Sequence, residues 1–136
     1  PPSVLDLYCG SGNLSLGLPG KLTVAGFDHN KAAIKAAYNV RQGEYITGGE
    51  VKMRKRIAKG DMDTILLDPP RAGAKSIMPA LAESTANAIV YVSCDPSTLA
   101  RDVKTLREAK WNLVRVTALD LFPNTPHVET VCRLER

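Results

Sequence analysis

Residues 3–12 read SVLDLYCGSG, an apolar run that passes directly into a Gly-x-Gly turn. The run is expected to form a buried strand, and ligands of open α/β sheets bind where such strands end. Gly10 and Gly12 would let a ligand approach the backbone closely, because glycine has no side chain. The GxGxxG dinucleotide fingerprint is incomplete, since Ser15 stands at its third glycine. This stretch predicts an α/β fold with a ligand site after its first strand.

Apolar runs and helical patterns alternate along the rest of the chain. Residues 22–27, 64–67 and 88–92 are expected to form further buried strands. Residues 113–119 and 128–134 are expected to form an antiparallel pair at the end of the sheet. Continuous apolar strands separated by helices indicate a mostly parallel sheet. The pattern therefore predicts a Rossmann-like methyltransferase fold of the α/β class, with an antiparallel C-terminal strand.

Helices are expected between these strands. Asp95 is placed to cap a helix over residues 96–109. A second helix follows Asn30, and a weaker one covers residues 74–83. One further strand is expected near residues 51–58, where the signal is poor. The residues expected to face the core from the first two helices are Leu99, Val103, Leu106, Ile34, Ala37 and Tyr38.

The composition is that of one globular domain. Of 136 residues, 44% are hydrophobic and 24% are charged. No apolar run reaches the length of a membrane helix and no targeting segment is visible, so no membrane partner is expected. Three cysteines without a CxxC pair argue against a disulfide framework or a metal site and favour the cytoplasm. Because the chain enters a core strand at once, residues 1–136 are expected to be a catalytic domain cut from a longer protein.

The charge distribution permits a nucleic-acid partner without demanding one. The net charge is +4, from 18 basic and 14 acidic residues. Such an excess is mild, so the distribution of the charges is more informative than their sum. Five basic residues fall close together and predict either a solvated strand end or loop, or a patch that contacts phosphates: Lys52, Arg54, Lys55, Arg56 and Lys59.

Two carboxylates flank the glycine turn. Asp6 stands just before it, and Asp28 ends the second strand. Acid, Gly-x-Gly, strand and acid in this order are typical of an S-adenosylmethionine site, with Asp6 toward the methionine and Asp28 on the ribose hydroxyls. Either carboxylate could instead stabilise the turn or helix cap that follows its strand, and Asp28 could simply belong to the start of the following helix. Cys9, within the turn, is expected to be a small packing residue.

Three later segments carry candidate reacting groups. Asp68 follows a strand within Asp-Pro-Pro-Arg, and Arg71 stands where methyltransferases of exocyclic amines carry an aromatic residue, which argues against that activity. Cys94 precedes a helix N-terminus, whose N–H groups favour a thiolate. This position favours a nucleophile over the alternative, a buried cysteine that only packs. Glu129 begins a strand and His127 lies just before it; taken alone, these would be a solvated carboxylate and a structural histidine.

The motifs DPPRAG, YVSCDPSTLARD and DLFPNTPHVE, in this order, resemble the RNA uracil-carbon-5 methyltransferases, which form 5-methyluridine in tRNA and ribosomal RNA. The resemblance covers nearly the whole chain as their C-terminal catalytic domain. It departs at Asp95, where the family usually has Asn. The resemblance implies Cys94 as nucleophile, Glu129 as general base, Asp68 as a carboxylate toward cofactor or base, and Tyr8, Asn13 and Asp28 as cofactor contacts.

The resemblance also implies the cofactor and the partners. These are S-adenosylmethionine and an RNA, tRNA or ribosomal, whose target base is flipped out of its stack. A monomer is expected. Arg101 and Asp102 either orient the loop or lie on an exposed helix face. The alternatives are a methyltransferase for exocyclic amines or small molecules, and a fragment that binds cofactor or RNA without turnover.

Overall fold

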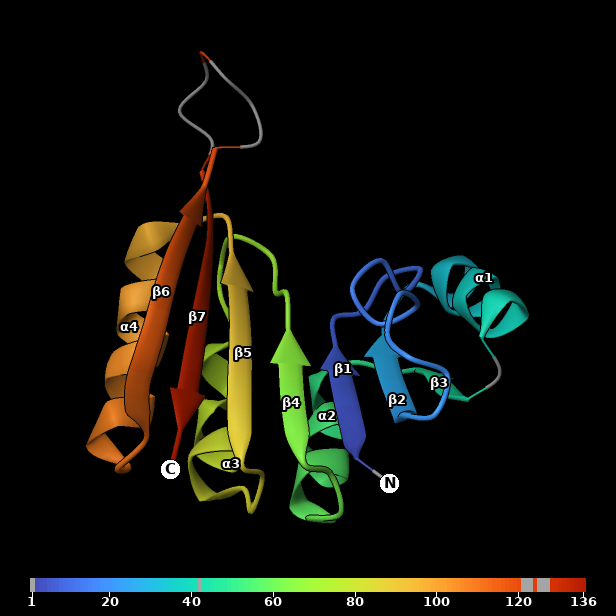
Figure 1. Cartoon of the computed structure of the whole chain (residues 1–136), viewed down its shortest axis with the longest axis horizontal. Coiled ribbons are helices and arrows are strands. Elements are labelled where there is room, and N and C mark those ends of the chain that lie inside the picture. The colour runs from blue at the N-terminus through green and yellow to red at the C-terminus, as the bar shows by residue number, and fades with distance from the viewer. Residues whose placement is uncertain (1, 42, 121–123, 125–127) are drawn as a thin grey trace.

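The computed structural model of the chain describes residues 2–41, 43–120, 124 and 128–136. Within them, seven strands form one sheet in the order β3-β2-β1-β4-β5-β7-β6 (Figure 1). β7 is antiparallel to both of its neighbours and every other pair is parallel, which confirms the expected fold class. The strands are β1 (Ser3–Leu7), β2 (Thr23–Asp28), β3 (Glu44–Thr47), β4 (Thr64–Leu67), β5 (Ala88–Ser93), β6 (Asn112–Leu119) and β7 (Glu129–Glu135). The helices are α1 (Lys31–Val40), α2 (Glu50–Ala58), the 3-10 helix η1 (Lys75–Ile77), α3 (Met78–Glu83) and α4 (Pro96–Glu108).

One predicted strand is wrong. Residues 51–58 lie in α2, and the missing strand is the preceding β3. Met53 and Ile57 are four residues apart and both are buried, which is the spacing of one helix face. β3 has four residues and pairs only with β2, so its pattern is too short to stand out. Four of the five basic residues of the cluster therefore lie on α2, and Lys59 lies in the turn that follows it.

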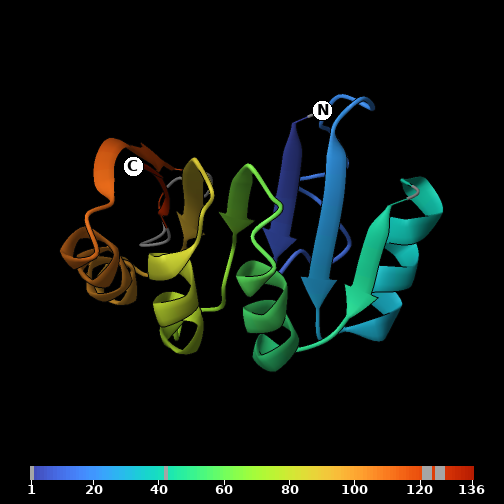
Figure 2. The same ribbon diagram turned by 90° about the horizontal axis from the view of Figure 1, so that it is seen from below.

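Helices cover both faces of the sheet. Figures 1 and 2 show α2, α3 and α4 on one face, while α1 packs on β2 and β3 from the other. α1 begins at Asn30, whose side chain accepts a hydrogen bond from the Ala33 amide. Ile34 and Ala37 are buried as predicted, but Tyr38 is 52% exposed. Because the sheet ends at β3, α1 has only a narrow surface to pack on.

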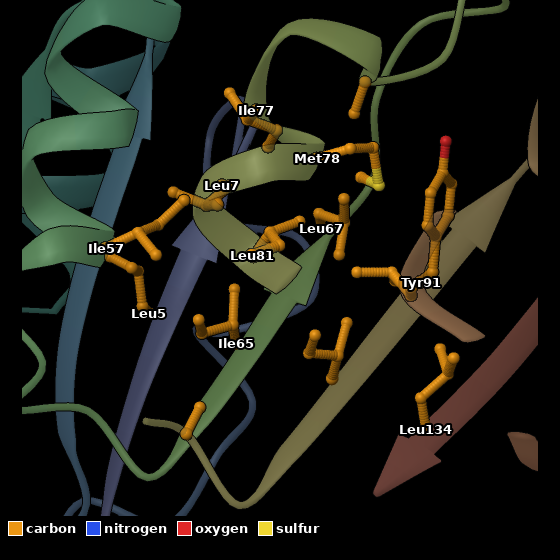
Figure 3. Packing of buried hydrophobic residues seen from close by; sticks show 14 of the residues in the cluster. Leu5, Leu7, Ile57, Ile65, Leu67, Ile77, Met78, Leu81, Tyr91 and Leu134 are labelled. Atoms are coloured by element: carbon orange, nitrogen blue, oxygen red, sulfur yellow. The ribbon is translucent and has the colours of Figure 1, made fainter. Parts of the chain in front are cut away.

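The main core lies between the sheet and α2, α3 and α4. Leu99, Val103 and Leu106 of α4 are buried there, as predicted. Each buried side chain of this size contributes roughly 2 kcal/mol. No helix of the described part of the chain could cross a membrane. Further members of the core, drawn in Figure 3, are Leu5, Leu7, Ile57, Ile65, Leu67, Ile77, Met78, Leu81, Tyr91 and Leu134.

Candidate active site

The carboxyl ends of β1, β4 and β5 lie side by side, and β7 begins at the same edge (Figure 1). Asp68 follows directly on β4, and Cys94 follows directly on β5. Ser93 pairs with Thr130 in the antiparallel ladder of β5 and β7. Cys94 is the residue after Ser93 and Glu129 the residue before Thr130, so both stand at the end of this ladder. The sheet therefore brings a thiol and two carboxylates together at one edge.

The Gly-x-Gly turn adopts backbone conformations that suit glycine. Gly10 has φ 55° and Gly12 has φ 86°. A Cβ on Gly12 would stand 2.8 Å from the Leu16 side chain, whereas nothing lies within 4 Å of a Cβ on Gly10. The backbone at Gly10 is thus open to a ligand. Tyr8 also has a positive φ, 57°, which is uncommon for a residue with a side chain and marks a constrained turn.

Asp28 connects this turn to α1. Its carboxylate accepts hydrogen bonds from the Gly10 amide at 3.0 Å and from the Asn30 amide at 2.8 Å. Asp28 is buried. Asp28 therefore stabilises the start of α1, as one of the two sequence interpretations proposed. The same carboxylate also binds the backbone of the Gly-x-Gly turn, where the cofactor is predicted. Asn13, by contrast, is exposed, and its side-chain oxygen accepts only a 3.4 Å hydrogen bond from the Ser11 hydroxyl.

Asp6 is fully buried without a hydrogen-bond partner. Its residue exposure is 0%, and among the described residues no donor bonds either carboxyl oxygen. Burial raises the pKa of Asp6 to about 6; the nearby Ser15 hydroxyl opposes the rise, and the charges of Asp68 and Asp28 add to it. Burying an unpaired carboxylate is costly, so this position suits a ligand that brings positive charge.

Asp68 and Glu129 form a second pair of carboxylates. Although the Asp68 residue is exposed overall, desolvation of its carboxyl group and the charge of Glu129 raise its pKa to about 6. Glu129 is half-buried, and its Oε2 atom has no hydrogen-bond partner among the described residues. With this raised pKa, the Asp68 carboxyl can accept and release a proton near neutral pH.

Cys94 occupies the turn into α4. The Asp95 carboxylate caps this helix, accepting from the Ser97 amide at 2.9 Å and the Thr98 amide at 3.1 Å. Cys94 is half-buried, whereas Cys9 and Cys132 are buried. Burial raises the pKa of the Cys9 thiol to about 12, so that thiol is inert. Cys9 and Cys132 both pack in hydrophobic clusters, which confirms the role expected for Cys9, and Cys94 lies at the predicted helix N-terminus.

Glu50 is a site residue that the sequence did not reveal. Its carboxylate accepts a 2.9 Å hydrogen bond from the Tyr8 hydroxyl and another from the Ser76 hydroxyl. Glu50 is the first residue of α2, so it holds the Tyr8 side chain toward that helix. Glu50 was not predicted because a strand, not a helix, was expected near residues 51–58. A helix predicted to begin at Glu50 would have indicated that this residue lies at the ligand edge.

The basic cluster extends away from this edge. α2 begins after the carboxyl end of β3 and leads to the amino end of β4. Arg56 pairs with Glu44 and Asp61, and Lys59 also lies 3.5 Å from Asp61. These pairings give Arg56 a structural role. Phosphate contact by the cluster stays a prediction. His127 and residues 121–123 of the DLFPNTPHVE motif lie outside the described residues.

Comparison with known proteins finds relatives that match nearly the whole chain. The family described as tRNA (Uracil-5-)-methyltransferase matches residues 51–136. The 23S rRNA (uracil(1939)-C(5))-methyltransferase RlmD of Klebsiella pneumoniae is 38% identical, covering 98% of this chain and 33% of that protein. The tRNA (uracil(54)-C(5))-methyltransferase of Pyrococcus abyssi is 40% identical, covering 96% and 32%. The chain thus spans about a third of the length of these relatives.

Solved structures agree with the fold. The Pyrococcus abyssi tRNA (uracil-54, C5)-methyltransferase, in complex with S-adenosyl-L-homocysteine, has a TM-score of 0.85 at 35% identity, covering 98% of this chain and 34% of that one. A precorrin-8w decarboxylase of Methanobacterium thermoautotrophicum has a TM-score of 0.76, covering 99% of this chain and 82% of that one. At 16% identity it shares the fold alone.

Proposed function

This chain belongs to the tRNA (uracil-5-)-methyltransferase family, and we propose that it is the catalytic domain of an enzyme that transfers a methyl group from S-adenosylmethionine to carbon 5 of a uridine in RNA. The observation that carries this proposal is the register of β5 and β7, whose last pair, Ser93 with Thr130, leaves Cys94 and Glu129 one residue away at the ligand edge. A thiol and a general base at one place are what methylation of carbon 5 requires.

The cofactor site is proposed around the end of β1. The unpaired carboxylate of Asp6 suits the positive charge of S-adenosylmethionine, and the open backbone at Gly10 gives it room. The relative from Pyrococcus abyssi holds S-adenosyl-L-homocysteine, the demethylated form of this molecule. The residues proposed to contact it are Asp6, Tyr8, Gly10, Gly12, Asn13, Asp28 and Asp68. When bound, it supplies an electrophilic methyl group.

Cys94 is proposed to activate the base. Its thiolate adds to carbon 6 of the uracil, a carbon–sulfur bond forms, and the electron pair of the ring double bond moves toward carbon 5 as an enolate. Carbon 5 then becomes nucleophilic enough to take up a methyl group. The thiol must approach carbon 6 from one face of the ring, so the target nucleotide is flipped out of its stack.

Glu129 is proposed to complete the reaction. The methylated carbon 5 still carries its proton, which the Glu129 carboxylate removes. The ring double bond then forms again, and the Cys94 thiolate leaves. Desolvation and the charge of Glu129 raise the pKa of the Asp68 carboxyl to about 6, so Asp68 can also take up a proton near neutral pH. Thiol and base both return to their starting forms after the proton passes to water.

The acceptor is proposed to be a uridine in tRNA or ribosomal RNA, as the names of the relatives state for those proteins. Residues 1–136 are proposed to be the catalytic domain of a longer protein that acts as a monomer in the cytoplasm. Three free cysteines agree with a reducing compartment. Arg71, in place of an aromatic residue, disfavours methylation of exocyclic amines.

A product assay tests the proposal. The full-length protein is incubated with S-adenosylmethionine and with tRNA or 23S rRNA transcripts, and the digested nucleosides are analysed by mass spectrometry. We expect 5-methyluridine, and we expect Cys94→Ala to abolish it. Cys132→Ala, a matched cysteine variant in β7, keeps the activity. Methylation on an exocyclic amine, or equal activity of Cys94→Ala, contradicts the proposal.

A further inference from the structure

Asp102 is a buried carboxylate that the proposed chemistry does not use. It lies in α4 and is 1% exposed. Its Oδ2 atom accepts hydrogen bonds from the Ala74 amide at 2.8 Å and from the Tyr91 hydroxyl at 2.6 Å. Its Oδ1 atom accepts from the Arg101 guanidinium at 3.1 Å. Both carboxyl oxygens thus accept hydrogen bonds, and the exposed-face interpretation is wrong for Asp102.

One partner of Asp102, the Ala74 amide, belongs to the loop at residues 68–74. Besides the Ala74 amide, the loop is held by two neighbours of Asp102 on α4. Arg101 donates to the Ala72 carbonyl at 2.9 Å, and the Thr98 hydroxyl donates to the Arg71 carbonyl at 2.8 Å. Three successive parts of the loop are therefore fastened to one helix.

Gly73 shows how closely the loop approaches that helix. Its φ is 78°, and a Cβ there would stand 2.7 Å from Arg101 Nη2 and 2.8 Å from Asp102 Oδ2. The amide of Gly73 also donates to the Pro70 carbonyl at 2.8 Å, which closes a turn. Only glycine suits both the backbone conformation and the space. The tether between loop and helix is thus built into the DPPRAG motif itself.

Tyr91 ties the same carboxylate to the sheet. The side chain of Tyr91 is fully buried, and Figure 3 shows its hydroxyl pointing out of the apolar cluster. Burial and the hydrogen bond to Asp102 raise the pKa of Tyr91, so its hydroxyl stays protonated and donates. Asp102 therefore joins three elements: β5, α4 and the loop after β4.

We propose that Asp102 is a positioning residue that sets the Asp68 loop against the Cys94 turn. Asp68 begins the loop that Asp102 holds, and Cys94 immediately precedes the helix that carries Asp102. Without this carboxylate, the Asp68 loop and the start of α4 could shift independently. The expected effect of Asp102 on turnover rests on the proposed function, whereas its expected effect on the position of the Asp68 loop does not.

Three variants separate the contributions of Asp102. Asp102→Asn keeps a carbonyl oxygen that can accept from both Ala74 and Tyr91. Asp102→Leu keeps the same branching and the same number of side-chain heavy atoms, and it removes every acceptor. A double variant, Thr98→Val with Arg101→Met, removes the two bonds to loop carbonyls and leaves the buried carboxylate in place, so it serves if Asp102→Leu fails to fold.

The experiment measures turnover and the titration of Asp68 in the full-length protein. We expect kcat for 5-methyluridine formation to fall at least tenfold in Asp102→Leu and in the double variant, and to stay within about threefold of wild type in Asp102→Asn. Carbon-13 NMR of the carboxyl group is expected to show the pKa of Asp68 falling from about 6 toward its ordinary value in the first two, because the loop moves away from Glu129.

Two results would overturn the proposal: unchanged kcat with an unchanged Asp68 titration in folded Asp102→Leu, or the same in the double variant. A wild-type protein that forms no 5-methyluridine instead contradicts the proposed function. In that case the Asp68 titration still decides whether Asp102 positions the loop, because it needs neither RNA nor turnover.

Discussion

Ser93 and Thr130 face each other in the antiparallel ladder of β5 and β7, one residue before Cys94 and one residue after Glu129. The parallel strands β1 and β4 end at the same edge and supply the buried Asp6 and the exposed Asp68. The sheet topology thus brings a thiol and three carboxylates from four distant parts of the chain to one edge.

Glu129→Gln should stop the reaction after methyl transfer. Gln cannot take the proton from carbon 5, so the Cys94–RNA bond cannot be released. We expect a methylated covalent RNA–protein complex that survives denaturing electrophoresis, with product formation at least 100-fold slower. Glu135→Gln, at the other end of β7 where Glu135 pairs with Arg133, is the control and should leave turnover unchanged. Normal product release by Glu129→Gln would contradict its role as base.

Asp6→Asn should stabilise the ligand-free protein in a pH-dependent way. The pKa of Asp6 is raised in the folded state, from 3.8 to about 6, so its contribution to stability is fully present below pH 3.8 and is lost as the pH rises to about 6. Relative to wild type, the variant should gain roughly 3 kcal/mol of unfolding free energy between pH 4 and pH 7.5. Urea denaturation across this range measures the gain.

The matched control for Asp6 is Asp61→Asn. Arg56 holds the pKa of the Asp61 carboxyl below its usual value, so the contribution of Asp61 is lost only as the pH falls through the acidic range. The difference between this variant and wild type should therefore be constant above pH 5. A difference between Asp6→Asn and wild type that is equally flat would contradict the burial argument. Asp6→Asn should also bind S-adenosylmethionine at least tenfold more weakly.

Gly73→Ala should disrupt the tether between the loop and α4. A methyl group there meets Arg101 and Asp102 at under 3 Å, in addition to the strain of a positive φ. Gly60→Ala is the control, since Gly60 has φ 70° but its nearest neighbour would be the Thr85 hydroxyl at 3.1 Å. Gly60→Ala should cost about 1 kcal/mol from backbone strain alone, and Gly73→Ala distinctly more, with a fall in kcat. Equal costs in thermal unfolding would contradict the steric argument.

The fold could be predicted from the sequence wherever apolar runs were continuous. β4 has the predicted bounds, and β1 lies where the first buried strand was predicted, directly before the Gly-x-Gly turn. β3 could not be predicted, because four residues at a sheet edge need little apolar surface. Tyr38 was expected in the core but is exposed. Helical spacing indicates which side chains share one face of a helix, but it does not indicate how much of that face the sheet covers.

The site could be predicted only in part. Cys94, Glu129 and Asp68 were found from motifs, and the strand register brings them to one edge. Asp102 was left between two interpretations because a sequence does not show whether a charged helix residue has partners. Glu50 was missed for a different reason, since its hydrogen bonds reach Tyr8, 42 positions earlier, and Ser76, 26 positions later. Contacts of this kind depend on packing, which no local pattern encodes.

The most direct test of the central claim is covalent trapping on RNA that carries 5-fluorouridine at the target position. Fluorine cannot be removed as a proton, so a thiolate that has added to carbon 6 stays attached. Mass spectrometry of the digested complex with S-adenosylmethionine should find a methylated fluorouridine on the peptide that contains Cys94. An adduct on Cys9 or Cys132, or no adduct from a protein that still forms 5-methyluridine on natural RNA, would contradict the account.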